Sequence, residues 1–419
     1  MIKTIIPILV LCLATAASAQ QALTWEEVRH RFELSNPTLR AAQLSIDEAK
    51  AQEVTAYLRP NPDFTLSTDG TQLTPSDGTW RPFAGTQFTT SLSYLHERGH
   101  KRELRLESAR GGTAIAESQL ADQERNLLFN LRSAFVQALQ ARAVLAVARE
   151  NLGYYDRMLG VNGDRFRAGD IAKVDFDRLQ LQRIQFESDV QNATVNMRTA
   201  KIQLQMLLND RTPVEQFDVT GPFEFQEPLT TLDELHRVAL ATRPDLRVAQ
   251  QTVDKAKADY RLAVANSTTD PTFASWYSRN PSFNNPFDTN TIGASVSIPL
   301  RIFDRNQGEK ARTQLEIRRS ERLLEATNNQ IFNDVDSAWA TLNSTLALLR
   351  PYKSNYLNLA TSVRETISFA YQSGGSSLLD FLNAQNDYRS TYLNYQNLIG
   401  SFLNAANQLN MAVGREVIR

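Results

Sequence analysis

The chain has 419 residues, with 45 lysines and arginines against 46 aspartates and glutamates, and a single cysteine, Cys12. A chain this close to neutral lacks the basic surface that holds a nucleic acid, which argues against that class of partner. Because Cys12 lies within the first 19 residues, which are expected to be removed, the mature chain has neither disulfides nor thiolate metal sites.

Residues 1–19 are typical of a secretory signal peptide: Lys3 precedes an apolar run from Ile5 to Leu13, and Ala17-Ser-Ala19 supplies small residues for cleavage. The apolar run is too short to span a membrane as a helix. Cys12 follows a leucine where a lipoprotein signal has a small residue, so we expect no lipid anchor. No later stretch approaches 18 consecutive apolar residues. The chain is therefore exported, and is either water-soluble or placed in a membrane as strands.

The mature sequence contains two copies of one unit. Asn36-Pro37-Thr-Leu-Arg40 returns as Arg243-Pro244-Asp-Leu-Arg247, about 207 residues later, and both prolines are expected to start a helix at its first turn. The sequence predicts a first repeat over residues 20–210, a linker rich in Pro, Gly and Phe over 211–229, and a second repeat over 230–419.

Each copy contains two short segments in which apolar and small polar residues alternate, at about 62–72 and 86–95, and at about 271–279 and 289–300. This pattern is typical of transmembrane barrel strands. A half-buried sheet in a water-soluble protein has the same alternation, and the pattern alone favours that reading. Four strands cannot close a barrel, so membrane-spanning strands require several chains, and three chains would give twelve strands.

The rest of each copy predicts helices of unusual length. Apolar residues recur at heptad spacing from about Lys101 to Arg165, and the same spacing continues through the second copy until Ala370. Pro351 lies within this second rod and should kink it. The return helices are expected over Val174–Leu208 and Leu378–Val413. About 65 helical residues make a rod of roughly 100 Å, which has no globular core to lie on and must pack against other rods.

Two similar stretches mark the turns between these rods. Gly169 is followed six residues later by Asp175, and Gly374 is followed six residues later by Asp380. The spacing Ser377-x-x-Asp380 predicts a capping box, with the acid in the positive first turn of the helix. Each copy therefore has a helical hairpin whose tip has an acidic residue.

The order and twofold spacing of these motifs resemble the TolC-like outer-membrane efflux family over essentially the whole mature chain. The resemblance also includes Glu97-x-Gly99-x-Lys-Arg102, which is similar to the heavy-metal branch, and Ser297-Ile-Pro-Leu300 before Asp304-Arg-Asn306. It implies an α+β membrane protein that forms a homotrimer. Four strands per chain would contribute to a 12-stranded β-barrel in outer-membrane lipid, and the coiled-coil hairpins would form an α-helical barrel across the periplasm.

The same resemblance implies a function and a site. The function is the exit duct of a tripartite efflux pump or type I secretion system, joined to a periplasmic adaptor and an inner-membrane transporter. By match within the motif, Asp380 would form a ring that closes the resting duct, and Asn383 would occupy the position where a second acid is sometimes found. Helix-start electrostatics explains the tip acids equally well.

In the family, the acid of the first tip can bind a basic residue, and that residue is replaced by Ser376 here. The tip and adaptor-contact residues implied by the match are Gly169, Asp175, Gly374, Gly375 and Ser376.

One pattern suggests an enzyme instead. His96-Glu97-Arg-Gly-His100 has the spacing of a zinc-hydrolase helix, but it includes a glycine and lies where a strand is expected to become a helix. The sequence has no phosphate-binding glycine loop and no convincing nucleophile with a base. We therefore expect no enzyme, metal or cofactor. A coiled-coil periplasmic scaffold is the main alternative to a duct, and a zinc hydrolase is a more remote one.

Overall fold

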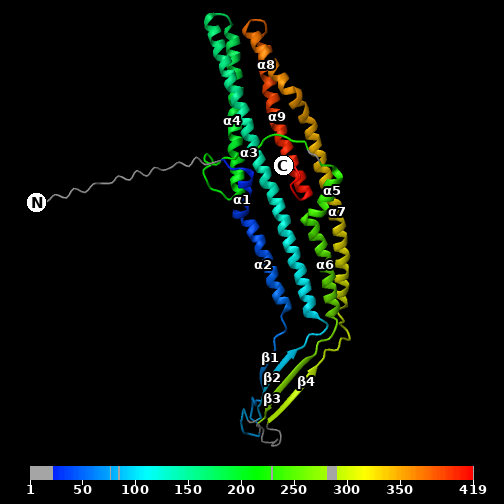
Figure 1. Ribbon diagram of the computed structural model, residues 1–419. Helices are drawn as coiled ribbons and strands as arrows, with labels where there is room; N and C mark the ends of the chain where they lie inside the picture. Colours follow the sequence, from blue (N-terminus) through cyan, green and yellow to red (C-terminus); the bar gives the residue numbers. More distant parts are fainter. Residues whose placement is uncertain (1–21, 76, 84, 228–229, 281–289, 419) are drawn as a thin grey trace, which may run out of the picture.

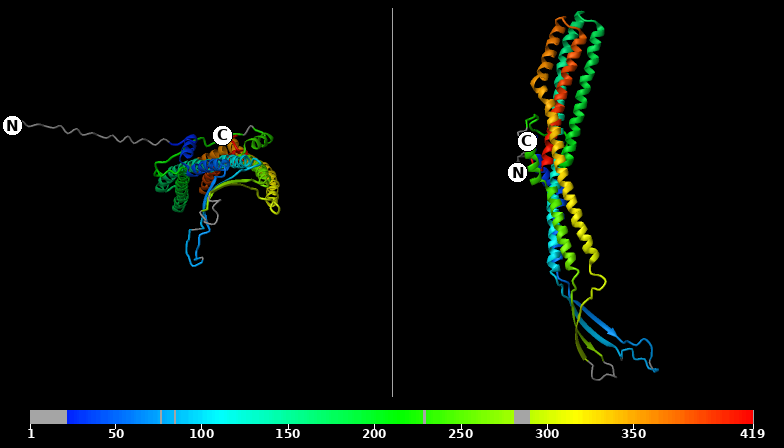
Figure 2. Two further views of the ribbon diagram at one scale, coloured as in Figure 1. Left: turned by 90° about the horizontal axis from the view of Figure 1, so that it is seen from below. Right: turned by 90° about the vertical axis from the view of Figure 1, so that its right-hand side faces the viewer.

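The computed structural model describes residues 22–75, 77–83, 85–227, 230–280 and 290–418. The predicted signal peptide lies outside these residues. The molecule is long and narrow, with a small sheet at one end and two helical hairpins at the other (Figure 1). The helices spread into one curved layer, and the sheet is inclined to it (Figure 2).

The two copies have the same order of elements. The first consists of α1 (Trp25–Ser35), α2 (Pro37–Tyr57), β1 (Asp63–Asp69), β2 (Gln87–Leu95), α3 (Lys101–Ala168) and α4 (Lys173–Leu207). The second consists of α5 (Leu232–Thr242), α6 (Pro244–Ala265), β3 (Thr272–Arg279), β4 (Asn290–Ser297), α7 (Gln307–Pro351), a π-helical turn (Tyr352–Tyr356), α8 (Leu357–Gln372) and α9 (Leu378–Val413).

The helix starts follow the expected chemistry, with one difference between the copies. Pro37 and Pro244 both occupy the first turn of a helix. Asn36 caps α2, and its side-chain oxygen accepts hydrogen bonds from two backbone N–H groups. Arg243 replaces it in the second copy and instead binds Asp245 and Asp334, with Nη1 2.9 Å from Asp334. Position 243 is therefore part of a buried ion-pair cluster rather than a helix cap.

The four strands form one antiparallel sheet in the order β1-β2-β3-β4, so β2 and β3 join the two copies. One face presents large apolar residues: Phe64, Leu66, Phe88, Leu92, Phe273, Tyr277, Ile292 and Val296. These side chains are exposed, to 64% at Phe64 and 85% at Ile292. The predicted strands are thus confirmed, but their apolar face does not lie on a core of this chain.

The opposite face of the sheet is mostly Ser and Thr, and its one aromatic residue within the described strands is a tryptophan. Trp276 lies on this face, paired with Gly293 on β4. β4 ends at Ser297 rather than at the predicted residue 300, because Pro299 has no N–H for the ladder.

The long helices confirm the predicted rods. α3 has 68 residues and packs along α2, α4, α6 and α9. Pro351 ends α7, and five residues of π-helix precede α8, so the second rod is interrupted where the proline predicts.

Buried side chains form three clusters along the length. Two of the clusters each belong mainly to one copy of the repeat. Fully buried members include Phe32, Phe135 and Phe217 in the first copy, and Leu342 and Phe402 in the second copy. The third cluster lies near the tips and takes residues from both hairpins: Tyr155, Leu179, Phe186, Tyr371 and Phe381.

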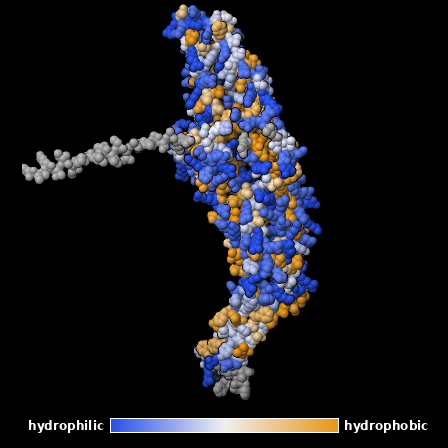
Figure 3. All heavy atoms as spheres, viewed as in Figure 1, coloured by the Kyte–Doolittle hydropathy of each residue, from blue (hydrophilic) through white to orange (hydrophobic). Residues whose placement is uncertain are grey.

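Hydrophobic residues gather over the sheet next to the helix ends (Figure 3). In the described part of the chain, no helix has a stretch sufficiently long and apolar to cross a membrane.

Candidate functional site at the hairpin tips

The two hairpin tips have the same construction. Gly169 and Gly374 both adopt left-handed backbone conformations, with φ of 85° and 77°, which end α3 and close the turn after α8. Behind each glycine two rings stack across the hairpin: Phe166 on Phe176 at 5.1 Å, and Tyr371 with Phe381 at 4.9 Å between centroids. The duplication seen in the sequence is therefore preserved in the packing of the tips.

Asp380 starts α9 as one half of a capping box. Its carboxylate accepts hydrogen bonds from the Ser377 hydroxyl at 2.7 Å and from the Ser377 N–H at 3.2 Å, and the Ser377 hydroxyl accepts from the Asp380 N–H. The Ser376 hydroxyl adds a third donor at 3.3 Å. These hydrogen bonds lower the pKa of Asp380 below its ordinary value. The hydrogen bonds thus fix the direction of the exposed carboxylate.

The structure places the other predicted tip residues as follows. Asn383 is exposed, one turn beyond Asp380 on the same face of α9. Asp175 is half-buried in the first turn of α4. Burial raises the pKa of Tyr371, and the charge of Asp175 adds to that effect while Arg165 opposes it. The Asp175 carboxylate therefore opposes ionisation of the Tyr371 phenol on the second hairpin.

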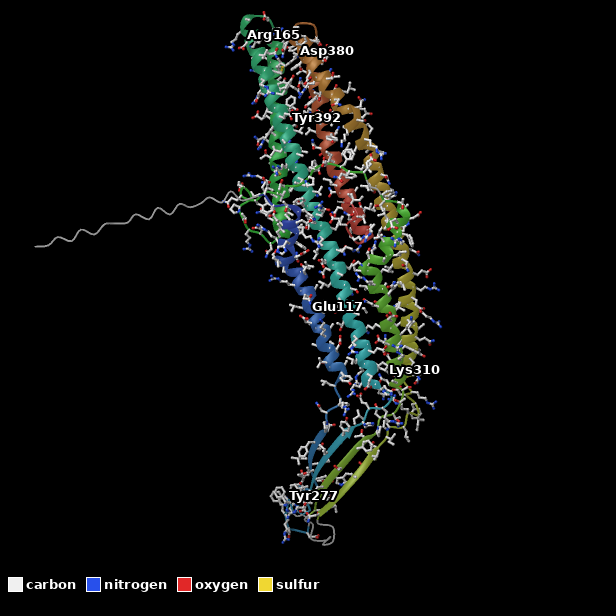
Figure 4. The ribbon with its side chains drawn as sticks, viewed as in Figure 1. Glu117, Arg165, Tyr277, Lys310, Asp380 and Tyr392 are labelled. Carbon is white, nitrogen blue, oxygen red and sulfur yellow. The ribbon has the colours of Figure 1, made fainter. Side chains whose placement is uncertain are left out.

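Arg165 joins the two tips, a role that the sequence did not reveal. It lies near the end of α3, and its Nη1 donates to the Tyr371 carbonyl oxygen at 3.3 Å. Its guanidinium also lies 5.6 Å from the centre of the Tyr371 ring. Arg165 and Asp380 lie at the same end of the molecule (Figure 4). A basic side chain of the first hairpin thus contacts the second hairpin. On the second hairpin itself, Ser376 occupies the position at which a basic residue is expected.

A buried arginine forms a second contact between the hairpins. Arg364 on α8 is 7% exposed and lies between two rings, 4.4 Å from Tyr154 on α3 and 3.4 Å from Tyr388 on α9. The Tyr154 hydroxyl and Ser368 are 3.1 Å apart, and the Gln385 amide donates to the same serine at 3.1 Å.

An ion pair forms the third contact. Arg389 on α9 binds both oxygens of Asp189 on α4, with Nη2 3.0 Å from Oδ1, and both side chains are mostly buried. Nearby, the Gln182 amide donates to Asn386 at 3.1 Å. We call Arg165–Tyr371, Arg364 with its two tyrosines, and Arg389–Asp189 the hairpin clasp.

Small polar residues form an exposed row along α9, which we call the polar stripe: Asp380, Asn383, Asp387, Ser390, Asn394, Asn397 and Ser401. Their alternating spacing of three and four places them on one face of the helix. The predicted ring positions therefore begin a longer polar surface, and Asp387 is a further acid on it. The heptad spacing of these polar residues is the sequence signal that would have found it.

The His-Glu-x-x-His pattern does not lie on a helix. β2 ends at Leu95 and α3 begins at Lys101, so His96 and His100 lie in the link between them. Glu97 binds Arg105, with Oε2 2.9 Å from Nη2. This geometry does not place two imidazoles on one helical face. Within the described ranges, no three His, Cys, Asp or Glu side chains are grouped to hold a metal.

Comparisons with known proteins give one family. The family model described as "Outer membrane efflux protein" matches residues 28–210 and 235–415. The cobalt-zinc-cadmium resistance protein CzcC of Cupriavidus metallidurans is 22% identical over 382 residues, which cover 91% of this chain and 87% of that protein. The pyoverdine export outer membrane protein OpmQ of Pseudomonas aeruginosa is 25% identical, covering 86% and 78%.

Solved structures have the same fold. The structure of CusC superposes with a TM-score of 0.78 at 19% identity, covering 93% of this chain and 92% of that chain. The Campylobacter jejuni outer membrane channel CmeC gives 0.75 at 15% identity, covering 93% and 85%.

Three findings point to the same family: the duplicated hairpins, the sheet shared by both copies, and the match of the family model to both repeats. The chain belongs to the outer membrane efflux protein family: it is an efflux channel of the outer membrane that extends into the periplasm.

Proposed function

We propose that three copies of this chain form one passive, non-enzymatic duct. Among the described residues, the sheet of one chain has unpaired edges at β1 and β4, and lipid does not tolerate open edges. Three sheets joined edge to edge would give a 12-stranded barrel with Phe64, Leu92 and Ile292 facing lipid. The observation that carries this proposal is the exposed apolar face of the sheet.

Residues 1–19 would be removed on export, and residues 20–210 and 230–419 would be the two repeats of the mature unit, joined by 211–229. The helical end would dock a periplasmic adaptor through the tip residues Gly169, Asp175, Gly374, Gly375 and Ser376, with an inner-membrane transporter supplying the cargo. The polar stripe would line the duct. Its amides and hydroxyls are chemically non-specific, so these partners would set the cargo.

The gate would lie at the tips. Threefold symmetry would bring three Asp380 carboxylates near the axis, with Asn383 as an uncharged second ring. The capping box fixes each carboxylate, and the hairpin clasp would hold α8 and α9 against α3 and α4 in the closed state. Contact with an adaptor would release the clasp and move the tips apart.

The assembly can be tested on the processed protein. We expect it to fractionate with the outer membrane and to run as a detergent-resistant trimer that forms conducting channels in planar bilayers. A water-soluble monomer would instead support the coiled-coil scaffold and would contradict the duct.

The gate is tested separately with Asp380→Asn, which removes charge without changing size. We expect a larger resting conductance and greater antibiotic sensitivity, because an uncharged amide accepts the hydrogen bonds from Ser376 and Ser377 more weakly and holds the tip less firmly. Asp170→Asn is the matched control, since Asp170 is an exposed acid on the first tip. Unchanged conductance in Asp380→Asn would count against the gate while leaving the duct in place.

A further inference from the structure

Two cavities meet midway along the molecule, away from the hairpin tips. Their volumes are about 280 and 400 Å³, and they share four lining residues: Trp25, Arg132, Asn407 and Asn410. They lie among α1, α3, α9, the segment around Gly221 and the segment after α9. Asn410 holds that last segment in place, because its oxygen accepts from the Val417 and Ile418 N–H groups at 2.7 and 2.9 Å.

Arg132 lies between the two cavities and contacts two aromatic rings. Its guanidinium is 4.5 Å from the centre of the Trp25 ring and 5.8 Å from that of Phe135. Within the described residues, no carboxylate or carbonyl oxygen accepts a hydrogen bond from it. Burial lowers the pKa of Arg132, and Glu416 and Glu26 oppose that effect from a distance. A half-buried guanidinium has five N–H donors, so this side chain is able to bind an anion bidentately.

The two cavities differ in chemistry. The larger is lined by five arginines and two glutamates, and so has a positive balance. Two of these arginines already bind carboxylates, Arg29 to Glu33 and Arg125 to Asp122, whereas Arg132 does not. The smaller cavity has apolar walls that include Phe135, Leu139 and Leu403, and its polar lining beyond Arg132 is Thr24, Glu26, Thr220, Asn407 and Asn410.

We infer that this pair of cavities is a binding site for a small amphiphilic anion. The carboxylate or sulfonate head pairs with Arg132 in the cationic cavity, and the short apolar tail enters the smaller cavity past Trp25. The site lies away from the hairpin tips, where the gate is proposed. Its ligand contacts α1, α3 and the segment after α9 together.

The probe is 8-bromooctanoate, because its bromine quenches a nearby indole and its chain is short enough for the smaller cavity. The purified protein in a neutral detergent is titrated while tryptophan fluorescence is recorded. We expect saturable quenching that disappears in Trp25→Phe. Arg132→Gln should weaken the apparent affinity about tenfold or more, since a charge-assisted pair is lost.

Arg157→Gln is the matched control. Arg157 also stacks on a tyrosine, 5.8 Å from the centre of the Tyr154 ring, but it lies on neither cavity. It should bind the probe as the unmodified protein does.

Gly221→Leu tests the tail without touching Arg132. A Cβ at Gly221 would lie 3.4 Å from Phe135 and 3.5 Å from Leu139, so the new side chain enters the smaller cavity without a clash at its first atom. This variant should also weaken binding, and it remains informative if Arg132→Gln does not fold. Wild-type affinity in either folded variant, or quenching that persists in Trp25→Phe, would overturn the site.

Discussion

Asp380 and Ser377 exchange hydrogen bonds in both directions, with the Ser377 hydroxyl 2.7 Å from the Asp380 carboxylate and 3.1 Å from its N–H. The acid at the expected gate position therefore also starts α9. The two interpretations of the acid, gate charge and helix start, do not compete in this geometry. The capping box fixes the carboxylate that would face the axis.

The first prediction concerns the pH at which Asp380, the proposed gate residue, loses its charge. Hydrogen bonds hold the pKa of Asp380 in the folded protein below its ordinary value of 3.8. The ionised carboxylate therefore contributes to folding stability above that ordinary value, and this contribution is lost as pH falls through the pKa of the folded protein. Ser377→Ala removes the serine hydroxyl donor and should therefore raise the pKa of Asp380. As pH falls, a channel with this variant should lose its cation selectivity at a higher pH than the unmodified channel. Reversal potentials across a salt gradient, measured against pH, give the midpoint.

Ser377→Thr retains the hydroxyl and is the control for that experiment. It should keep the original midpoint. Identical midpoints in Ser377→Ala and the unmodified channel would show that the capping box does not hold the charge of Asp380.

The second prediction separates the clasp from the gate charge. Asp189→Asn and Arg389→Gln each leave one buried charge without its partner, so each should destabilise the closed contact between α4 and α9 and raise resting conductance. The exchange Asp189→Arg with Arg389→Asp should restore much of the closed state, because it restores the pair. Additive single effects with no recovery in the exchange would mean that the pair does not hold the hairpins together.

Local sequence signals predicted most of the elements, and the tips show why. Gly169 and Gly374 each end a helix through their own backbone freedom, and the Ser377–Asp380 box needs only residues three apart. Heptad spacing likewise predicted the return helix that ends at Val413.

The clasp could not be predicted in that way. Arg165 and Tyr371 are 206 positions apart, and Arg389 and Asp189 are 200 apart, so these pairs exist only after the two hairpins pack. Trp276 was missed for a related reason. It occupies a face on which Ser and Thr predominate, and this placement depends on the absence of a side chain at Gly293 on the neighbouring strand.

The third prediction tests that pairing. A Cβ at Gly293 would lie 2.2 Å from the Trp276 ring, so Gly293→Val must displace the indole and should weaken the β3–β4 pairing. The temperature at which the proposed trimer dissociates in detergent should fall. Gly308→Ala is the control, since nothing lies within 4 Å of a Cβ there. If the dissociation temperature recovers in the double variant Trp276→Ser with Gly293→Val, the clash lies between these two side chains. An unchanged dissociation temperature in Gly293→Val alone would contradict the close contact.

The fourth prediction concerns the junction between sheet and helices. Lys101 is 4% exposed, and its ammonium group binds Asp270 and, at 2.9 Å, the Thr268 carbonyl oxygen. Lys101→Met leaves the Asp270 carboxylate without its cation in a mostly buried position, which should cost about 3 kcal/mol of folding stability. Lys101→Met with Asp270→Asn should recover part of this loss, because the unpaired charge is gone. Denaturant unfolding in detergent, followed by circular dichroism, measures both. A single variant as stable as the unmodified chain would mean that Lys101 does not compensate Asp270.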